Sequence, residues 1–384
     1  MAAMTSRERI RAAMMRQPVD HVPCSISFNE LSPVQRQGHA WQFPWQSDTP
    51  GDEKLRYQVE ELGLDQVVNM GVNLCRPVPG IESKVWLEGG ILHKTYTTPA
   101  GELHAAVRHN ELWPHGQDIP FYSDFNIGHY VEPWLQTAAD LACFRQVRHL
   151  CTPDEMLEVA RANAAAAKTR AKQYDLATAA RIGMGLTGAQ HLFGASELCM
   201  MTLDQPELVE AYLEYEHQIN LRAIELVGEL GIDIVWRNGF YETADFYSPA
   251  MLEQFLGARL RREADAARSA GMLTNYTVHT GVVPILDHLA GLSFDALFGI
   301  DIAFQDLDMR QLRDTLTPTK SLWIGPSSTH HLWKGPEATR QAVRDVFEVF
   351  GQTGLVLSPG VSAHSIMPWE STLALIDEWR KLTE

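Results

Sequence analysis

Apolar residues in the second half of the chain alternate between helical spacing and short apolar runs. Residues 206–231 place an apolar stripe at helical spacing, and the run IDIVW at 232–236 follows as a strand. Residues 248–271 open with serine and proline, which is typical of a helix start, and stop at a glycine. The strand LTNYTVH at 273–279 comes next. The pattern thus indicates helices between consecutive strands.

The same alternation continues to the end of the chain. Helices are predicted at 282–291, 309–316, 336–354 and 370–382, with strands at 294–301, 321–325 and 355–360. Strands separated by helices form parallel sheets, and this many units in succession favour closure into an eight-stranded α/β barrel, the (β/α)8 or TIM barrel.

The first 150 residues follow a less regular pattern. Helices at 7–17 and 53–65 precede the strands VPCSIS and QVVNM. Residues 82–108 alternate like an antiparallel β-hairpin with a turn near Pro99-Ala100-Gly101. The alanine-rich run near 160–172 predicts a helix, with Thr152 as its N-cap. We interpret the hairpin as an N-terminal embellishment of one barrel domain spanning residues 1–384.

Composition and charge narrow the classes of function. The formal net charge is −16, which disfavours nucleic acid and anionic lipid as partners. No signal peptide is evident and no run approaches the roughly 18 to 20 apolar residues of a membrane span, so we expect a cytoplasmic location. The five cysteines are scattered and include no CxxC pair, which argues against a disulfide framework or a cysteine-only zinc site.

Polar side chains follow the predicted strands at their carboxyl ends. Since active sites of α/β barrels lie at that end, these residues are expected to share one rim. They include Asn29 and Glu30 after the first strand, Arg237, Asn238 and Glu242 after the strand at 232–236, and then His279 and Asp301. The loops after the last two strands add His330, His331 and His364.

Several short motifs resemble the uroporphyrinogen decarboxylase superfamily across essentially the whole chain. They are MTSRERIRAAMMRQPVDHVP, ELGLD, TPAGEL, the segment His279-Thr280-Gly281, LFGID, WIGP and LSPGVSAHSIMPWES. The resemblance implies an α/β barrel and one of two chemistries. One is porphyrinogen decarboxylation, and the other is methyl transfer by zinc enzymes that work with corrinoid proteins.

The segment after the first strand departs from the decarboxylase pattern. True decarboxylases carry an arginine-rich, MRQAGR-like segment there that holds substrate carboxylates. This chain has SISFNELSPVQRQGHAWQFPW at that place. The segment contains a single arginine, Arg36, and a cluster of aromatic residues. A substrate with many carboxylates would lack its cationic clamp, so porphyrinogen decarboxylation is disfavoured.

A second departure separates the chain from thiol-methylating relatives. The pattern of those relatives has a His-x-Cys-Gly motif and a second cysteine within the sequence SPGC. Here the first motif is the HTG of His279 to Gly281, and Val361 stands where the second cysteine would be. A cysteine-rich zinc site is therefore excluded at these positions.

The resemblance then implies the first methyltransferase of an O-demethylase system. Such an enzyme moves the methyl group of an aryl methyl ether to the cobalt of a separate corrinoid protein. Zinc is the expected metal, held by Glu242 and His279, with Asp245, Asp301 or His364 as further candidate ligands. We expect Glu242, His279 and Asp301 to be catalytic. Phe28, Asn29, Trp41 and Asn238 are expected to bind substrate.

Plainer roles remain open for each of these residues. His279 can simply bond a loop, Glu242 can cap the helix that starts at Ser248, and Asp301 can anchor a neighbouring loop. The aromatic residues Phe28, Trp41, Phe43 and Trp45 can pack together instead of lining a site. Two other functions also remain: a decarboxylase or lyase acting on a small acid, and a non-catalytic member that binds a ligand at the barrel mouth.

Overall fold

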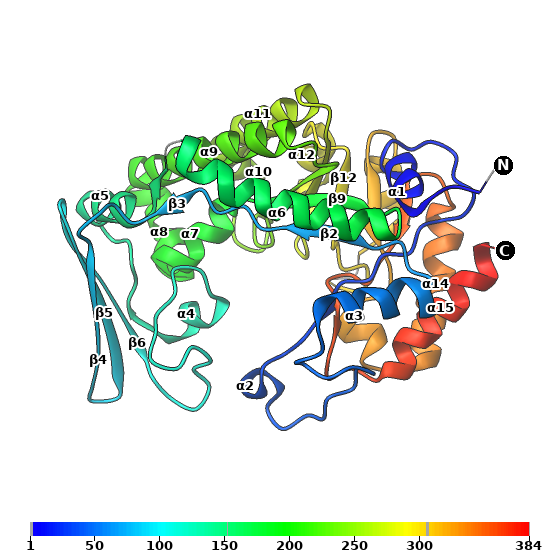
Figure 1. Ribbon diagram of the computed structural model, residues 1–384, viewed down its shortest axis with the longest axis horizontal. Coiled ribbons are helices and arrows are strands. Elements are labelled where there is room, and N and C mark those ends of the chain that lie inside the picture. Colours follow the sequence, from blue (N-terminus) through cyan, green and yellow to red (C-terminus); the bar gives the residue numbers. More distant parts are fainter. Residues whose placement is uncertain (1–2, 152, 305–306, 384) are drawn as a thin grey trace.

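A computed structural model describes residues 3–151, 153–304 and 307–383, and for residues 153–156 the backbone only. The molecule is elongated, with a helix-covered barrel toward the chain termini and a small antiparallel sheet at the opposite end (Figure 1). The N-cap predicted at Thr152 lies outside the described residues.

The central sheet has seven parallel strands. Their order is β14-β13-β12-β11-β10-β9-β2, so β9 to β14 lie side by side in chain order, as expected of repeated strand-helix units. The strands are β2 (Val67–Met70), β9 (Ala177–Ile182), β10 (Ile234–Asn238), β11 (Leu273–Thr277), β12 (Ala296–Phe298), β13 (Ser321–Ile324) and β14 (Leu355–Leu357).

The segment around Cys24 closes this sheet into a barrel. Ser25 N donates to Leu357 O at 2.9 Å, which ties the segment to β14. Asp65 N donates to Cys24 O at 2.8 Å immediately before β2, which ties its other edge. The segment predicted as the first strand therefore completes an eight-stranded α/β barrel, and the predicted fold class is confirmed.

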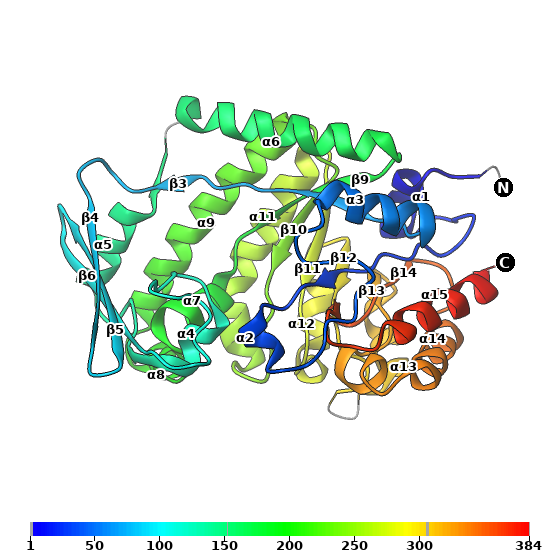
Figure 2. The same cartoon turned by 60° about the horizontal axis from the view of Figure 1, so that its bottom comes forward.

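Helices surround the barrel and cover its outer face (Figure 2). The long helix α9 packs against α11, and α14 packs against α15. The helices are α1 (Ser6–Met14), α2 (Pro33–Arg36), α3 (Gly51–Arg56), α4 (Asp124–His129), α5 (Ala138–Val147), α6 (Pro153–Gln173), α7 (Gly185–Phe193), α8 (Ala195–Asp204), α9 (Pro206–Glu229), α10 (Pro249–Leu252), α11 (Ala258–Ser269), α12 (Leu286–Gly291), α13 (Met309–Leu316), α14 (Pro336–Phe350) and α15 (Trp369–Thr383).

Short helical turns interrupt or extend some of these elements. They are η1 (Tyr57–Glu61), η2 (Glu253–Gly257), η3 (Val283–Ile285) and η4 (Ser328–Leu332). The turn η2 joins α10 to α11, so the helix predicted at 248–271 is one element with a π-helical turn inside it. No described helix is long and apolar enough to cross a membrane.

The predicted hairpin is a larger antiparallel sheet of four strands. It is formed by β4 (Glu82–Glu88), β5 (Ile91–Thr98), β6 (Gly101–Arg108) and β7 (Tyr130–Glu132). The turn at Pro99-Ala100 is where it was predicted, but a second turn at Gly89-Gly90 divides the first half into two strands. Both glycines have positive φ, as the type I′ form of a two-residue hairpin turn requires, and the sequence analysis did not predict this turn.

Four short strands, paired two by two, complete the fold. The strand β1 (Phe28–Asn29) pairs in parallel with β15 (Ala363–His364), so the loops after the first and last barrel strands lie together. The strand β3 (Cys75–Arg76) pairs with β8 (His149–Leu150) and brings Arg148 toward the end of β2. All five cysteines are free, as expected.

Candidate functional site at the barrel mouth

Glu242 lies in the loop after β10 and is bound by three donors. Its Oε1 accepts hydrogen bonds from Leu186 N at 2.8 Å and Arg237 Nη2 at 3.2 Å. Its Oε2 accepts one from the Tyr276 hydroxyl at 2.5 Å. Only 1% of the residue is exposed. Glu242 therefore joins the end of β10 to β11 and to the start of α7.

The electrostatic surroundings of Glu242 favour its neutral form. Burial is the largest effect and raises the pKa of this carboxyl to about 7, helped by the negative Glu216. Arg237 and the Tyr276 hydroxyl act in the opposite direction. A carboxyl that titrates near neutral pH suits proton transfer.

Arg237 is the centre of this buried network. It is 2% exposed, and its Nε donates to Glu263 Oε2 at 3.2 Å in addition to its bond with Glu242. Glu263 also accepts from His217 Nδ1 at 2.8 Å and from Asn220 at 3.0 Å. These contacts outweigh the effect of burial and lower the pKa of Glu263. The network fixes α9, α11 and β10 relative to one another.

His279 follows β11 and is oriented by the next strand. Its Nδ1 lies 2.9 Å from Gly299 O, so the ring donates through Nδ1 and leaves Nε2 as an acceptor. Burial lowers the pKa of His279, which favours the neutral ring. The Phe240 ring packs on it with centroids 5.1 Å apart.

Asp301 lies beside His279 at the end of β12. Its backbone N donates to His279 O at 3.0 Å, and its Oδ2 accepts from the Ser327 hydroxyl at 2.8 Å. Its Oδ1 accepts from Ala303 N at 3.0 Å. Asp301 thus anchors the loops after β11, β12 and β13, which is the plainer of the two roles predicted for it.

The other rim candidates have local partners. Thr280 donates its hydroxyl to Asp245 Oδ2 at 2.5 Å. His364 Nδ1 lies 3.3 Å from Asn29 Nδ2, as the pairing of β1 with β15 requires. His331 Nδ1 accepts from Ser327 N at 2.9 Å. Its neighbour His330 packs instead near Phe304, with ring centroids 6.4 Å apart.

The predicted zinc site can be compared with this arrangement. Protein zinc sites use at least three side-chain ligands. Within residues 3–151, 157–304 and 307–383 no group of three His, Cys, Asp or Glu side chains is placed to hold a metal ion. The described side chains do not form a complete zinc site, so ligation by Glu242 and His279 stays a prediction.

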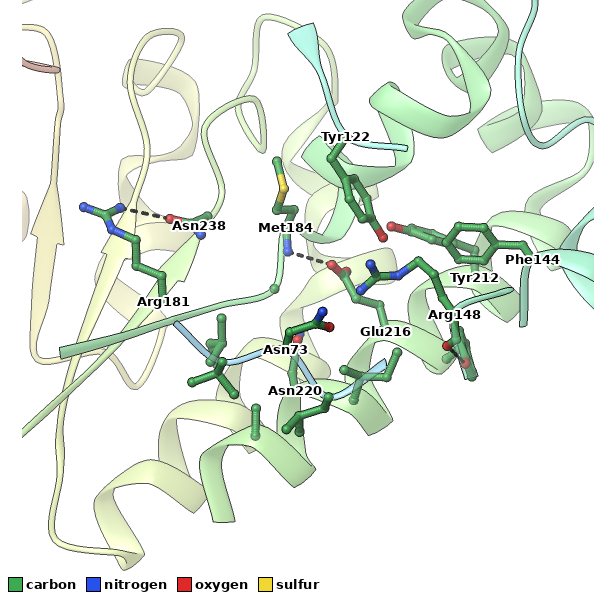
Figure 3. A pocket seen from close by; sticks show the side chains of 17 residues that line it. Asn73, Tyr122, Phe144, Arg148, Arg181, Met184, Tyr212, Glu216, Asn220 and Asn238 are labelled. Atoms are coloured by element: carbon green, nitrogen blue, oxygen red, sulfur yellow. Dashed lines mark hydrogen bonds between the residues drawn. The ribbon is translucent and has the colours of Figure 1, made fainter. Parts of the chain in front are cut away.

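A cavity of about 290 Å³ opens beside the carboxyl ends of β2, β9 and β10. Its walls combine the aromatic rings of Tyr122, Phe144, Tyr212 and Tyr215 with a few polar groups (Figure 3). In Figure 3, Arg181 and Asn238 lie at one end, whereas Tyr122, Tyr212 and Arg148 lie at the other. Such a mixture of rings and convergent polar groups is typical of small-molecule sites.

Glu216 of α9 projects into the middle of this cavity. Its two carboxylate oxygens accept from Met184 N and Gly185 N, both at 2.6 Å. Burial raises the pKa of Glu216, and Arg237 lowers it. Glu216 thus fixes the turn between β9 and α7, where Gly185 has a φ of +50°.

At the end of the cavity away from Arg181, the hydroxyls of Tyr122 and Tyr212 face one another (Figure 3). Burial raises the pKa of Tyr122 and of Tyr212, so both hydroxyls keep their protons. The Tyr212 hydroxyl is itself buried, and the Tyr122 hydroxyl is its nearest polar neighbour in the cavity wall. The Arg148 guanidinium lies over the Tyr122 ring, 5.1 Å from its centroid.

A second cavity of about 220 Å³ lies inside the barrel. Its inward-facing residues include Asn69, Arg181, Trp236 and Trp323, and Phe28 closes one side. Trp236 packs edge-on against Trp323 with ring centroids 5.1 Å apart. Arg181 lines both cavities and is the polar residue between them.

The two cavities contain only part of the predicted substrate-binding set. Asn238 lines the first and Phe28 lines the second. Trp41 instead packs on Phe43, and its Nε1 donates to Trp45 O at 2.5 Å. The cluster after the first strand is mostly aromatic packing, with Phe43 and Trp45 buried. Neither cavity wall includes Glu242, His279 or Asp301.

Sequence reasoning missed most of the first cavity. Tyr122 and Arg148 come from the irregular first 150 residues, while Tyr212 and Glu216 lie on the apolar face of a long helix. One signal was available, because Arg181 is a charge within the apolar strand LATAARI immediately before a glycine turn. A charge at a predicted barrel-strand end is a candidate for the site.

Residues 122–382 match the family model described as Uroporphyrinogen decarboxylase (URO-D). No curated protein matches the sequence at a significant level.

Two solved structures share the fold along nearly the whole chain. A methyltransferase from Methanosarcina mazei is 19% identical with a TM-score of 0.58, covering 98% of this chain and 99% of its own. A B12-independent methionine synthase from Shewanella sp. W3-18-1 is 11% identical with a TM-score of 0.50, covering 94% and 98%. At these identities the likeness establishes the fold alone. Because the family model covers more than half of the sequence, the chain belongs to the uroporphyrinogen decarboxylase family.

Proposed function

We propose that this protein is a methyltransferase that takes the methyl group of a methoxylated aromatic compound and delivers it to the cobalt of a separate corrinoid protein. The observation that carries the proposal is the first cavity. It lies at the strand ends of the barrel, has aromatic walls, and contains two neutral phenol donors. Its volume of about 290 Å³ suits one small ring and not a porphyrinogen.

The fold of the solved neighbours is consistent with this chemistry. One of them is named a methyltransferase and the other a methionine synthase. The second is described as B12-independent, so the shared barrel does not by itself imply cobalamin. The corrinoid partner therefore rests on the sequence resemblance and on the need for a strong nucleophile at an unactivated methyl ether.

The difficulty of the reaction lies at the oxygen. The C–O bond breaks with its electron pair remaining on oxygen, while the methyl carbon forms its new bond to reduced cobalt. The corrinoid supplies the nucleophile, and the protein has to stabilise the departing phenolate. Hydroxyls that keep their protons are suitable donors, so we assign the Tyr122 and Tyr212 end of the cavity to the ether oxygen.

The remaining residues position this end of the site. Arg148 lies over the Tyr122 ring and adds positive charge near the developing phenolate. Glu216 holds the β9–α7 turn through its two backbone hydrogen bonds. Phe144 and Tyr215 supply further ring surface in the wall and limit access of water to the bound substrate.

The test measures methyl transfer with reduced corrinoid protein and a panel of methoxybenzenes, methylamines and methyl thiols. Tyr212→Phe removes one hydroxyl of the phenol pair assigned to the ether oxygen and is expected to lower kcat on a methoxybenzene about 100-fold, with little change in KM. Tyr174→Phe is the matched control, because the Tyr174 hydroxyl bonds Gln173 outside the cavity. Turnover of amines or thiols alone would contradict the aryl-ether donor, and activity of Tyr212→Phe equal to wild type would contradict the role of this hydroxyl.

A further inference from the structure

Arg181 lies at the junction of the two cavities. It is in β9, one residue before the strand ends at Ile182, and it lines both cavity walls. Its Nη1 donates to Asn238 Oδ1 at 3.2 Å. Its guanidinium lies over the Trp236 ring, 4.5 Å from the centroid. The side chain is thus held in place by one amide and one indole. It borders the first cavity on one side and the second cavity on the other.

The neighbouring interior arginine provides a contrast. Arg237, on the next strand, forms ion pairs with both Glu242 and Glu263 at 3.2 Å. In the part of the chain that the structure describes, no carboxylate lies within ion-pair distance of Arg181. Its only protein acceptor there is a neutral amide oxygen.

An interior cation without a partner is costly for the fold. Burial lowers the pKa of Arg181, and no neighbouring charge offsets this effect. Arginine nevertheless stays protonated in proteins, so its remaining N–H groups need acceptors. Because Arg181 lies in the walls of two cavities, a bound ligand can supply these acceptors.

We propose that Arg181 binds the carboxylate of the substrate, which makes the methyl donor a methoxylated aromatic carboxylate. This inference rests on the proposed function for the identity of the ring and its methoxy group. The guanidinium matches a carboxylate in bidentate geometry. Arg181 and the phenol pair lie at opposite ends of the first cavity, so the carboxylate and the ether oxygen occupy opposite ends of one ring (Figure 3).

Binding tests this directly, without corrinoid or turnover. Isothermal titration calorimetry compares para-methoxybenzoate, its neutral methyl ester and para-methoxyphenyl phosphate. Because a hydrogen bond to a charged group contributes roughly 1.5–3 kcal/mol, the acid is expected to bind about 10- to 100-fold more tightly than the ester. Equal affinity for acid and ester would overturn the proposal, and tighter binding of the phosphate would overturn the carboxylate assignment.

Variants locate the effect. Arg181→Met should weaken binding of para-methoxybenzoate about 10- to 100-fold and leave the ester within about twofold. Arg181→Lys keeps the charge and should recover part of the affinity. Arg340→Met, on α14 outside the barrel, is the control and should bind like wild type. An acid preference that persists in a folded Arg181→Met protein would overturn the proposal, and circular dichroism confirms folding. The wild-type comparison of acid and ester decides the question if no variant folds.

The two proposals fail in different ways. If para-methoxybenzoate binds through Arg181 but no methyl group reaches cobalt, the carboxylate site is supported and the methyl-transfer function fails. If cobalt is methylated equally from acid and ester, and Arg181→Met is as active as wild type, methyl transfer is supported and this inference is overturned.

Discussion

Replacing Glu242 by glutamine should change how the stability of the protein depends on pH. Glu242 is buried and accepts hydrogen bonds from Leu186 N, Arg237 and the Tyr276 hydroxyl. Glutamine keeps the size and an acceptor oxygen but does not titrate. The difference between wild type and Glu242→Gln therefore isolates the ionisation of this one carboxyl.

The sign and size follow from its pKa. Burial raises the pKa of Glu242 from 4.5 to about 7 in the folded protein. The folded state then holds this proton more tightly than the unfolded state, so stability is lost as the pH rises from about 4.5 to about 7. One pKa unit corresponds to about 1.4 kcal/mol, so wild type should lose about 2–3 kcal/mol relative to Glu242→Gln between about pH 5 and about pH 8.

Urea denaturation followed by tryptophan fluorescence measures this difference at several pH values. Glu225→Gln controls for the loss of one negative charge, because Glu225 lies on the surface with its side chain 58% exposed. A difference between wild type and Glu242→Gln that stays constant from about pH 5 to about pH 8 would refute the reasoning. It would mean that Arg237 and Tyr276 keep the carboxylate ionised in spite of its burial.

Three further predictions concern the same end of the barrel. Arg237→Met leaves two buried carboxylates without their cation and should lower the free energy of unfolding by about 3–5 kcal/mol, measured by urea denaturation; a loss below about 1 kcal/mol would contradict the network. Gly185→Ala should lower the free energy of unfolding by about 2 kcal/mol or more in the same assay, because Gly185 has positive φ and a Cβ there would meet Glu242 and Arg237. Gly38→Ala is the control and should cost less, because Gly38 also has positive φ but a Cβ there would meet nothing. His279→Ala tests the zinc ligation predicted for His279: it should lower the zinc content found by elemental analysis, and an unchanged zinc content would contradict that ligation.

The barrel could be predicted from the sequence because its strands and helices differ in period. Apolar runs such as IDIVW and LTNYTVH alternate with helical stripes, and the structure contains β10 and β11 at those places. The antiparallel sheet was predicted only in part. Alternation indicates strands but does not divide them, and the turn at Gly89-Gly90 was marked only by its glycines.

The site was harder to predict because it is assembled from distant segments. Strand-end reasoning found Asn238, which lines the first cavity, and also Glu242 and Asp301, whose oxygens bond to the protein. Phe28, which lines the second cavity, was predicted from the aromatic cluster after the first strand. Arg148 enters the cavity through pairing of β3 with β8, which no local pattern reveals. Whether Arg181 was paired could not be known before its neighbours were placed.

Transfer of an isotopically labelled methyl group tests the central claim most directly. Para-methoxybenzoate labelled in its methoxy carbon is mixed with this protein and a reduced corrinoid protein, and the product is followed by NMR and by the cobalt absorption spectrum. We expect the label on cobalt and one phenol released for each cobalt methylated. The corrinoid protein is first shown to accept a methyl group from a chemical donor. The account is contradicted if no label reaches cobalt from this donor and if methoxybenzenes, methylamines and methyl thiols also leave the cobalt spectrum unchanged.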